Sequence, residues 1–143
     1  MKNKKLILQE LKRREALHYP AFMRQMEYLS SWKDLDDYCE GEPTVIMGKG
    51  DGYAIHTKDE IVDVASSSPL EAMVLFLILR KHFSKHEKRI SADFRNSTSY
   101  PILLAAASKG MVIIHKKRDW WWEGELMMEV EFSFTLRYPH QVG

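Results

Sequence analysis

Apolar residues recur at helical spacing in two segments near the N-terminus. Residues 4–17 place a few apolar side chains among charged ones, which predicts a surface helix. From Pro20 to Trp32 apolar residues repeat at intervals of three and four, which predicts a second helix that begins at the proline and packs on the core. The acidic segment 34–42 ends in glycine and proline signals, so we expect a solvated helix end or a loop there.

After residue 43 the pattern changes to short β-favouring segments separated by turn residues. Three strands are predicted, at 44–47, 53–57 and 61–64. The glycine-rich segment 48–52 lacks the strand-to-helix context and the Gly-Lys-Ser/Thr ending of a phosphate loop, so we interpret it as a hairpin turn. Together these segments predict an antiparallel meander.

Two capped helices and further strands are predicted in the rest of the chain. Serines before Pro69 and the run Asn96-Ser97-Thr98-Ser99 are N-cap signals, and Gly110 is a helix end. The helices are expected at 69–83 and 100–109, and strands at 90–94, 111–114 and 126–134. The last strand alternates apolar and polar residues, and a turn near residues 123–124 pairs it with the tryptophan-rich strand before it.

The two apolar helices and the alternating strand are expected to cover each other. The predicted core therefore includes Val74, Leu75, Leu77, Ile78, Leu103, Leu104, Phe132 and Phe134. We expect the strands at 61–64 and 90–94 to lie side by side and parallel in one sheet, joined right-handedly through the helix after Pro69.

The composition is that of one globular domain over residues 1–143, with a helical part at 1–42 and a sheet-containing part at 43–136. The chain has 21 Lys+Arg against 20 Asp+Glu, and this balance argues against nucleic acid as the main partner. Its most apolar stretch, residues 72–79, is far shorter than the roughly 20 residues of a membrane span. Because Cys39 is the single cysteine, a disulfide within the chain and a Cys-based zinc site are excluded. We therefore expect no membrane partner and a cytoplasmic location.

Histidines and tryptophans supply two candidate features. His82 and His86 are four residues apart, but no third ligand is near them and lysines surround them, so no metal site is expected. In a strand, Trp120 and Trp122 point to one face and Trp121 to the other. At least one indole is then available for a protein partner, while core filling and edge protection remain alternatives.

The predicted order of elements over residues 43–136 resembles that of the GNAT superfamily of acyl-CoA N-acetyltransferases. The run RISADFRNSTSYPILLAAASKGMVII is also similar to short acetyltransferase-like proteins of tailed bacteriophages. The resemblance implies an α+β fold of three layers, with a mixed, mainly antiparallel sheet and helices on both faces. It also implies a place in the cytoplasm of a bacterial host, or in the virion if a phage encodes the protein.

The same resemblance implies acetyl-CoA as the cofactor and an amine as the acceptor. It places cofactor binding at Ser67, Ser68 and Asn96. A base at Glu60 or Asp63, or His56 on the adjacent strand, would take the proton of the amine; a solvated strand edge is the alternative for these residues. Tyr100 takes the place of the tyrosine that serves the family as general acid.

Two departures from the family pattern bear on activity. The loop between the cofactor-binding strand and helix has no glycine and contains Pro69 and Glu71, and Tyr100 lies at the start of its helix rather than inside it. Two functions are therefore considered: an acetyl-CoA-dependent N-acetyltransferase, and a non-catalytic acetyltransferase-like module that binds another protein. The departures favour the second.

Overall fold

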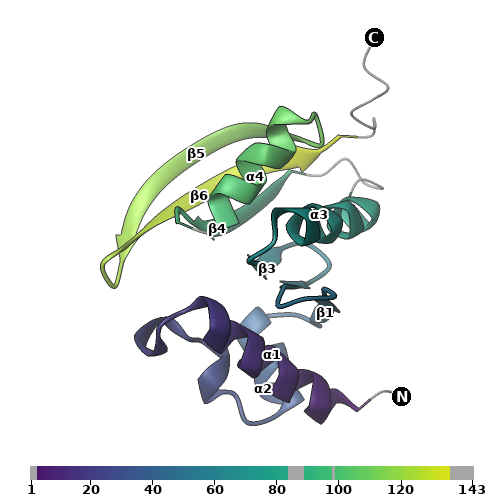
Figure 1. Ribbon diagram of the computed structural model, residues 1–143, viewed down its shortest axis with the longest axis vertical. Coiled ribbons are helices and arrows are strands. Elements are labelled where there is room, and N and C mark those ends of the chain that lie inside the picture. The colour runs from purple at the N-terminus through teal and green to yellow at the C-terminus, as the bar shows by residue number, and fades with distance from the viewer. Residues whose placement is uncertain (1–2, 84–88, 98, 136–143) are drawn as a thin grey trace.

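Two three-stranded antiparallel sheets and four α-helices make up the part of the chain described by the computed structural model, residues 3–83, 89–97 and 99–135 (Figure 1). The chain is therefore of the α+β class, as predicted. One sheet has the order β1 (Thr44–Met47), β2 (Tyr53–His56), β3 (Ile61–Ala65). The other has the order β4 (Ile90–Arg95), β6 (Glu125–Phe134), β5 (Val112–Trp122).

The four helices are α1 (Lys4–His18), α2 (Trp32–Cys39), α3 (Pro69–Phe83) and α4 (Ser99–Ser108). In Figure 1, α1 and α2 lie together at the N-terminal end of the molecule, while α3 and α4 lie beside the two sheets. Helix α3 joins β3 to β4, and α4 joins β4 to β5. Within the described ranges, no helix combines the length and the apolar composition that crossing a membrane requires.

The prediction of one mixed sheet is wrong. Strands β3 and β4 lie near one another, but no ladder of hydrogen bonds joins them, and every strand pair is antiparallel. All six residues of β4 pair with β6, and side chains of β3 and β4 line two cavities where a ladder between the strands was expected. The two sheets are therefore separate, and they share a hydrophobic core on the α3 side while polar and aromatic side chains line the cavities between β3 and β4.

Alternate residues of β2 and β3 point to opposite faces of the first sheet, and helices pack against both faces. Tyr53 and Ile55 pack with Leu8 and Leu11 of α1, whereas Val64 packs with residues of α3. The core on the α3 side extends to the second sheet. Its largest fully buried side chains are Phe76, Phe94, Phe132, Leu75, Leu79 and Ile90.

Half of the residues predicted for the core are exposed, so the prediction is wrong for them. Leu75, Leu103, Phe132 and Phe134 are buried, but Val74, Leu77, Ile78 and Leu104 are exposed over 42–48% of their surface. Helices α3 and α4 are apolar around much of their circumference, and the structure buries only one face of each. Composition alone therefore could not distinguish the buried face.

The continuous helix predicted from Pro20 to Trp32 is also wrong. Two single turns of 3₁₀-helix, Ala21–Met23 and Met26–Tyr28, occupy this segment. The buried carboxylate of Glu15 accepts the backbone N–H groups of Gln25 and Met26, which an α-helix would have bonded to carbonyls. The acidic segment forms α2 instead, which Ser31 and Asp34 open with a capping box.

The C-terminal hairpin agrees with the prediction. Glu123 and Gly124 both have positive φ, 51° and 79°, as a two-residue type I′ turn requires. Trp121 is 70% exposed, whereas Trp120 and Trp122 point to the other face and line a cavity. The alternation predicted for the three indoles is confirmed.

Replacing Leu103 tests the packing of α4 on the second sheet. Leu103→Ala should lower the free energy of unfolding by about 2–5 kcal/mol, because the side chain is fully buried. Leu17→Ala, at a position 59% exposed on α1, should change it by less than about 0.5 kcal/mol. Urea unfolding of both variants measures this, and similar losses at the two positions would contradict the assigned core.

Candidate functional site

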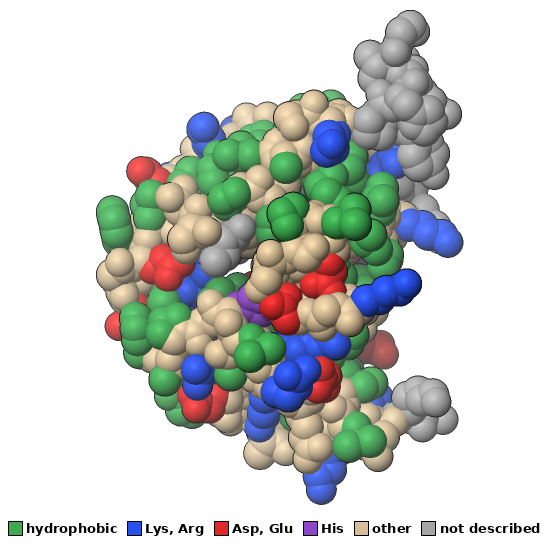
Figure 2. Space-filling model, in the orientation of Figure 1, with side chains coloured by type: hydrophobic (Ala, Val, Ile, Leu, Met, Phe, Trp, Pro, Cys, Tyr) green, Lys and Arg blue, Asp and Glu red, His purple; other side chains and the backbone are tan. Residues whose placement is uncertain are grey.

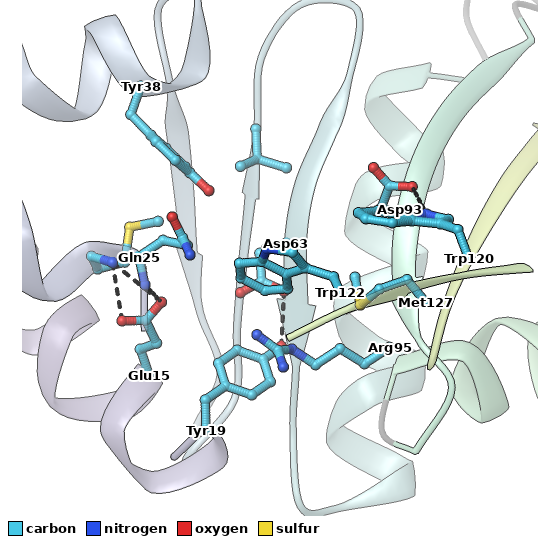
Figure 3. Close-up of a pocket in the computed structure, with 12 residues that line it drawn as sticks. Glu15, Tyr19, Gln25, Tyr38, Asp63, Asp93, Arg95, Trp120, Trp122 and Met127 are labelled. Atoms are coloured by element: carbon cyan, nitrogen blue, oxygen red, sulfur yellow. Dashed lines mark hydrogen bonds between the residues drawn. The ribbon is translucent and has the colours of Figure 1, made fainter. Parts of the chain in front are cut away.

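A cavity of about 240 Å³ lies where the N-terminal helical part meets β3 and the tip of the second sheet (Figure 3). Its lining includes three carboxylates, those of Glu15, Asp63 and Asp93, and one cation, Arg95. Aromatic side chains form much of the remaining wall: Tyr19, Tyr38, Trp120 and Trp122. An aromatic cavity with excess negative charge is a chemical environment that favours a cation.

Two tyrosine hydroxyls hold the carboxylate of Asp63. Tyr19 donates to Oδ1 at 3.0 Å, and Tyr53 donates to Oδ2 at 2.7 Å. Burial raises the pKa of Asp63 above its ordinary value, although the two hydroxyls favour the charged form. Burial and the charge of Asp63 together raise the pKa of both tyrosines, which therefore remain donors. Each carboxylate oxygen keeps a lone pair for a further donor.

Arg95 is fixed among protein groups. Its guanidinium lies 3.6 Å from the ring centre of Tyr19 and donates to the Met23 carbonyl at 3.3 Å and to Glu125 Oε2 at 3.2 Å. The side chain is only 7% exposed. Arg95 thus ties β4 to the segment after α1, and Glu125 compensates its charge.

Glu15 and Asp93 complete the acidic lining. Glu15 Oε2 accepts from Gln25 N at 2.9 Å and Oε1 from Met26 N at 3.0 Å, and burial raises the pKa of Glu15. Asp93 Oδ1 accepts from the indole Nε1 of Trp120 at 3.1 Å, and burial likewise raises the pKa of Asp93. With Arg95 paired to Glu125, the lining carries more negative than positive charge.

A second cavity, of about 260 Å³, continues along β3 and β4. It shares Tyr38, Val62 and Asp93 with the first cavity and adds Glu40 and Glu60. Burial raises the pKa of Tyr38 to about 12. The structure therefore places Glu60 in the neighbouring cavity, and Asp63 in the first.

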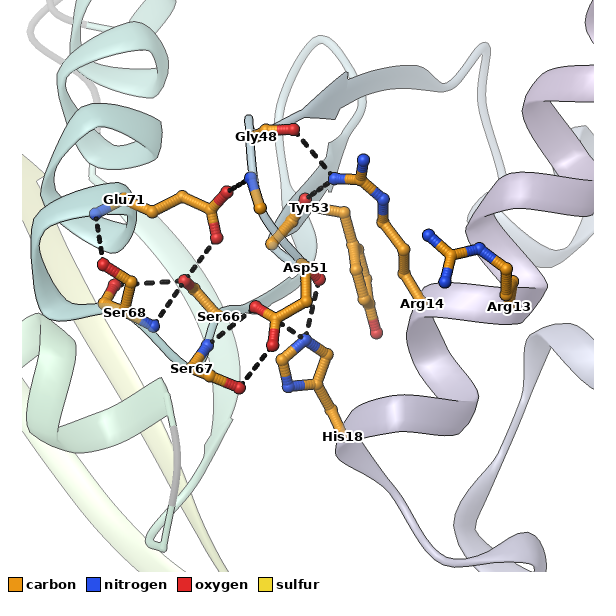
Figure 4. Close-up of polar contacts among 12 residues, drawn as sticks. Arg13, Arg14, His18, Gly48, Asp51, Tyr53, Ser66, Ser67, Ser68 and Glu71 are labelled. Carbon is orange, nitrogen blue, oxygen red and sulfur yellow. Dashed lines mark hydrogen bonds and ion pairs between the residues drawn. The ribbon is translucent and has the colours of Figure 1, made fainter.

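The N-terminus of α3, where the resemblance places the cofactor, binds carboxylates of the protein itself (Figure 4). Ser67 donates its backbone N–H to Asp51 Oδ1 at 3.0 Å and its hydroxyl to Asp51 Oδ2. Glu71 accepts from the Ser66 hydroxyl at 2.6 Å and from Gly50 N, while its own N–H donates to Ser68 Oγ at 3.2 Å. Groups suited to bind a phosphate are thus already bonded within the chain.

The glycine-rich segment is a hairpin turn, as predicted, and it closes around Glu71. A Cβ added at Gly48 would lie 2.3 Å from Glu71 Oε2, so the carboxylate needs glycine there. On the other side, Arg14 donates to the carbonyls of Gly48 at 2.9 Å and Gly52 at 2.6 Å. The turn therefore links α1 to α3.

The remaining predicted site residues lie apart from the first cavity. Tyr100 is 6% exposed and packs in the core beneath α4. Asn96 is exposed after β4, and its backbone N–H donates to the Leu126 carbonyl at 3.0 Å. His56 contacts Phe83 on the α3 face of the first sheet, opposite to Asp63, so His56 and Asp63 do not form a proton relay. The second histidine of the considered metal pair, His86, lies outside the described residues, as does Thr98 of the predicted cap.

Sequence reasoning missed Glu15, Tyr19 and Arg95. A signal for Glu15 was present, because it follows Leu8 and Leu11 at helical spacing and so lies on the buried face of α1. Nothing local marks Tyr19 or Arg95, whose contacts join residues more than 40 positions apart.

Comparisons with protein-family models, curated proteins and solved structures found no match for this chain. In the part of the chain that the structure describes, no three His, Cys, Asp or Glu side chains gather as a metal site. Inference about function therefore rests on the cavity and on the sequence resemblance.

A double-mutant cycle tests the turn around Glu71. Gly48→Ala should cost about 1–2 kcal/mol of stability, because the added Cβ displaces the carboxylate from its donors. In a Glu71→Ala background the same change should cost much less, with a coupling of about 1 kcal/mol. Gly41→Ala is the control, since its Cβ would meet only Thr57 at 3.7 Å. An unchanged cost of Gly48→Ala in urea unfolding of the double variant would contradict the assigned contact.

Proposed function

We propose that this protein is an acetyltransferase-like binding module that receives a protonated amine in the first cavity. The observation that carries the proposal is the lining itself: three carboxylates and four aromatic rings surround one arginine that Glu125 already pairs. A protonated primary amine offers three N–H donors and a positive charge. Carboxylates accept those donors, and the aromatic rings stabilise the charge.

Asp63 and Asp93 are the acceptors we assign to the ammonium group. Tyr19 and Tyr53 hold Asp63 from the protein side, and Trp120 holds Asp93, so neither carboxylate must reorganise to bind. A small amine and the end of a lysine side chain of a partner protein share this chemistry. Trp121 exposes its indole on the opposite face of the hairpin from this cavity, so it does not decide between the two sources.

The sequence resemblance supports placing this module among acetyltransferase-like proteins. A helix joins β3 to β4, a second helix joins β4 to β5, and a long hairpin follows, in the order that the GNAT resemblance implies. In this proposal the cavity beside β3 corresponds to the side on which the family's amine acceptor would lie.

Calorimetric titration with butylamine and with butanol tests amine binding. The two molecules are similar in size, so a preference for butylamine measures the charge. Asp93→Asn should weaken butylamine binding by about 1–3 kcal/mol while keeping the acceptor for Trp120, and Asp37→Asn, at an exposed position of α2, should not change it. Because burial raises the pKa of Asp63 and Asp93, the affinity should fall as pH decreases, and the fall should begin at a higher pH than for an ordinary aspartate, whose pKa is about 3.9.

Three outcomes of that experiment have different meanings. Equal binding of butylamine and butanol, or an affinity that does not depend on pH, would contradict a charged acceptor. Tighter binding of a lysine-containing peptide than of butylamine would identify a protein as the source. Butylamine binding that no lysine-containing peptide exceeds would identify a small amine.

Acetyl transfer from acetyl-CoA is the second candidate function. The observation in its favour is a groove of about 700 Å³ beside Ser67, Ser68 and the first turn of α3. The residues present do not fit a pyrophosphate, however, because Asp51 and Glu71 place two negative charges beside this helix end and already accept from Ser67 and from Gly50 N. We therefore derive no step that uses the cofactor.

Titration with acetyl-CoA separates the two candidates. The binding-module proposal expects no heat of binding at millimolar acetyl-CoA for the wild-type protein. If the cofactor does bind, Glu71→Gln should strengthen binding by about 0.3–1 kcal/mol, since a negative charge at the helix N-terminus opposes the phosphates. That gain should shrink as salt increases. Binding by the wild type, together with acetylation of butylamine, would overturn the non-catalytic assignment.

A further inference from the structure

Helix α3 exposes an apolar stripe that the sequence predicts to be mostly buried. Leu70, Val74, Leu77 and Ile78 are exposed over 78, 48, 42 and 43% of their surface. Figure 2 shows hydrophobic side chains gathered over α3 and α4, the region to which these residues belong. We call these four residues the α3 stripe. Large contiguous apolar patches on a protein surface mark sites of association.

The spacing of the stripe suits another helix. Positions 70, 74 and 77 follow the three- and four-residue intervals of a helix-packing seam, and Lys81 continues the same line. In contrast to a binding pocket for a small molecule, this surface is a ridge about 17 Å long, from position 70 to position 81. Its natural partner is a helix with a matching apolar ridge.

The two ends of the stripe are complementary in charge. Lys81 lies exposed at its C-terminal end. At its N-terminal end, Leu70 and Val74 border the groove of about 700 Å³, whose charged lining is Asp51, Glu71 and Lys49, two carboxylates against one cation. A helix that runs antiparallel to α3 and carries a lysine at its far end would place that lysine beside Asp51.

A second copy of this chain supplies such a helix. We propose that two copies associate through the α3 stripe, with the two α3 helices antiparallel across a two-fold axis. We place the two-fold axis midway between positions 74 and 77 of α3. Positions 70 and 81 are equally far from that midpoint along the helix. The rotation therefore places Val74 of one copy against Leu77 of the other. It also places Lys81 of one copy against Leu70 of the other copy and against the groove that contains that copy's Asp51. A two-fold contact is isologous, so one self-complementary surface suffices.

Sedimentation velocity over a concentration series tests the association. The wild-type protein should form a dimer, and Leu77→Glu should raise the dissociation constant more than about tenfold, because each dimer carries the buried charge twice. Leu6→Glu, at an exposed apolar position of α1, should leave the dimer intact. Misfolding of Leu77→Glu would be excluded if its far-UV circular dichroism spectrum and its unfolding transition match those of the wild type. Both proteins are measured at concentrations where they are monomeric.

Cysteine cross-linking tests the register of the contact. When Val74→Cys and Leu77→Cys proteins are mixed and oxidised, the mixed disulfide should form faster than either symmetric one. A wild-type protein that stays monomeric throughout the series, or a dimer that Leu77→Glu does not weaken, would overturn the proposal. If Val74→Cys or Leu77→Cys alone forms its symmetric disulfide faster than the mixture forms the mixed disulfide, the antiparallel register would be overturned. Capture of a different protein by a monomeric chain would reassign the stripe to that partner.

Discussion

The carboxylate of Asp63, held between two tyrosine hydroxyls, is the interaction on which the site depends. Burying a charge costs several kcal/mol unless donors compensate for the lost water. Here Tyr19 supplies one donor from the end of α1 and Tyr53 the other from β2, so satisfying Asp63 requires the N-terminal part to dock on the first sheet. The same docking encloses the acidic cavity. Tyr19 and Asp63 therefore both dock the N-terminal part on the first sheet and line the cavity.

Internal carboxylates recur as links between distant segments. Glu15 holds the 3₁₀ segment after α1, Glu71 holds the glycine-rich turn, and Glu125 pairs with Arg95. Each satisfies donors that would otherwise need water or a ligand. At the N-terminus of α3 the consequence is functional, because donors engaged by Glu71 and Asp51 are not available to an external anion. The loop before α3 is therefore poorly suited to bind an external anion.

Local signals in the sequence predicted most elements. The meander, both capped helices of the second half and the type I′ hairpin follow from periodicity, caps and turn residues that lie close together in the chain. The separation of the two sheets, the exposed face of α3 and the 3₁₀ segment depend on contacts between distant residues, which periodicity does not contain. Within the site, Asp63 was expected only as a base that the GNAT resemblance implies, not as the acceptor of two tyrosine hydroxyls. Tyr19 and Arg95 were not expected, since their roles exist only once α1, β3 and β4 meet.

The charge state of Asp63 is the most direct test of this account. Side-chain carboxyl carbons can be followed by NMR as pH is varied, with Asp63→Asn identifying the resonance. The pKa of Asp63 should lie above the usual value of about 3.9 because the group is buried, and saturating butylamine should lower its midpoint because the proposed amine site needs a carboxylate. An Asp63 whose midpoint is not raised, or is unaffected by butylamine, would contradict this account.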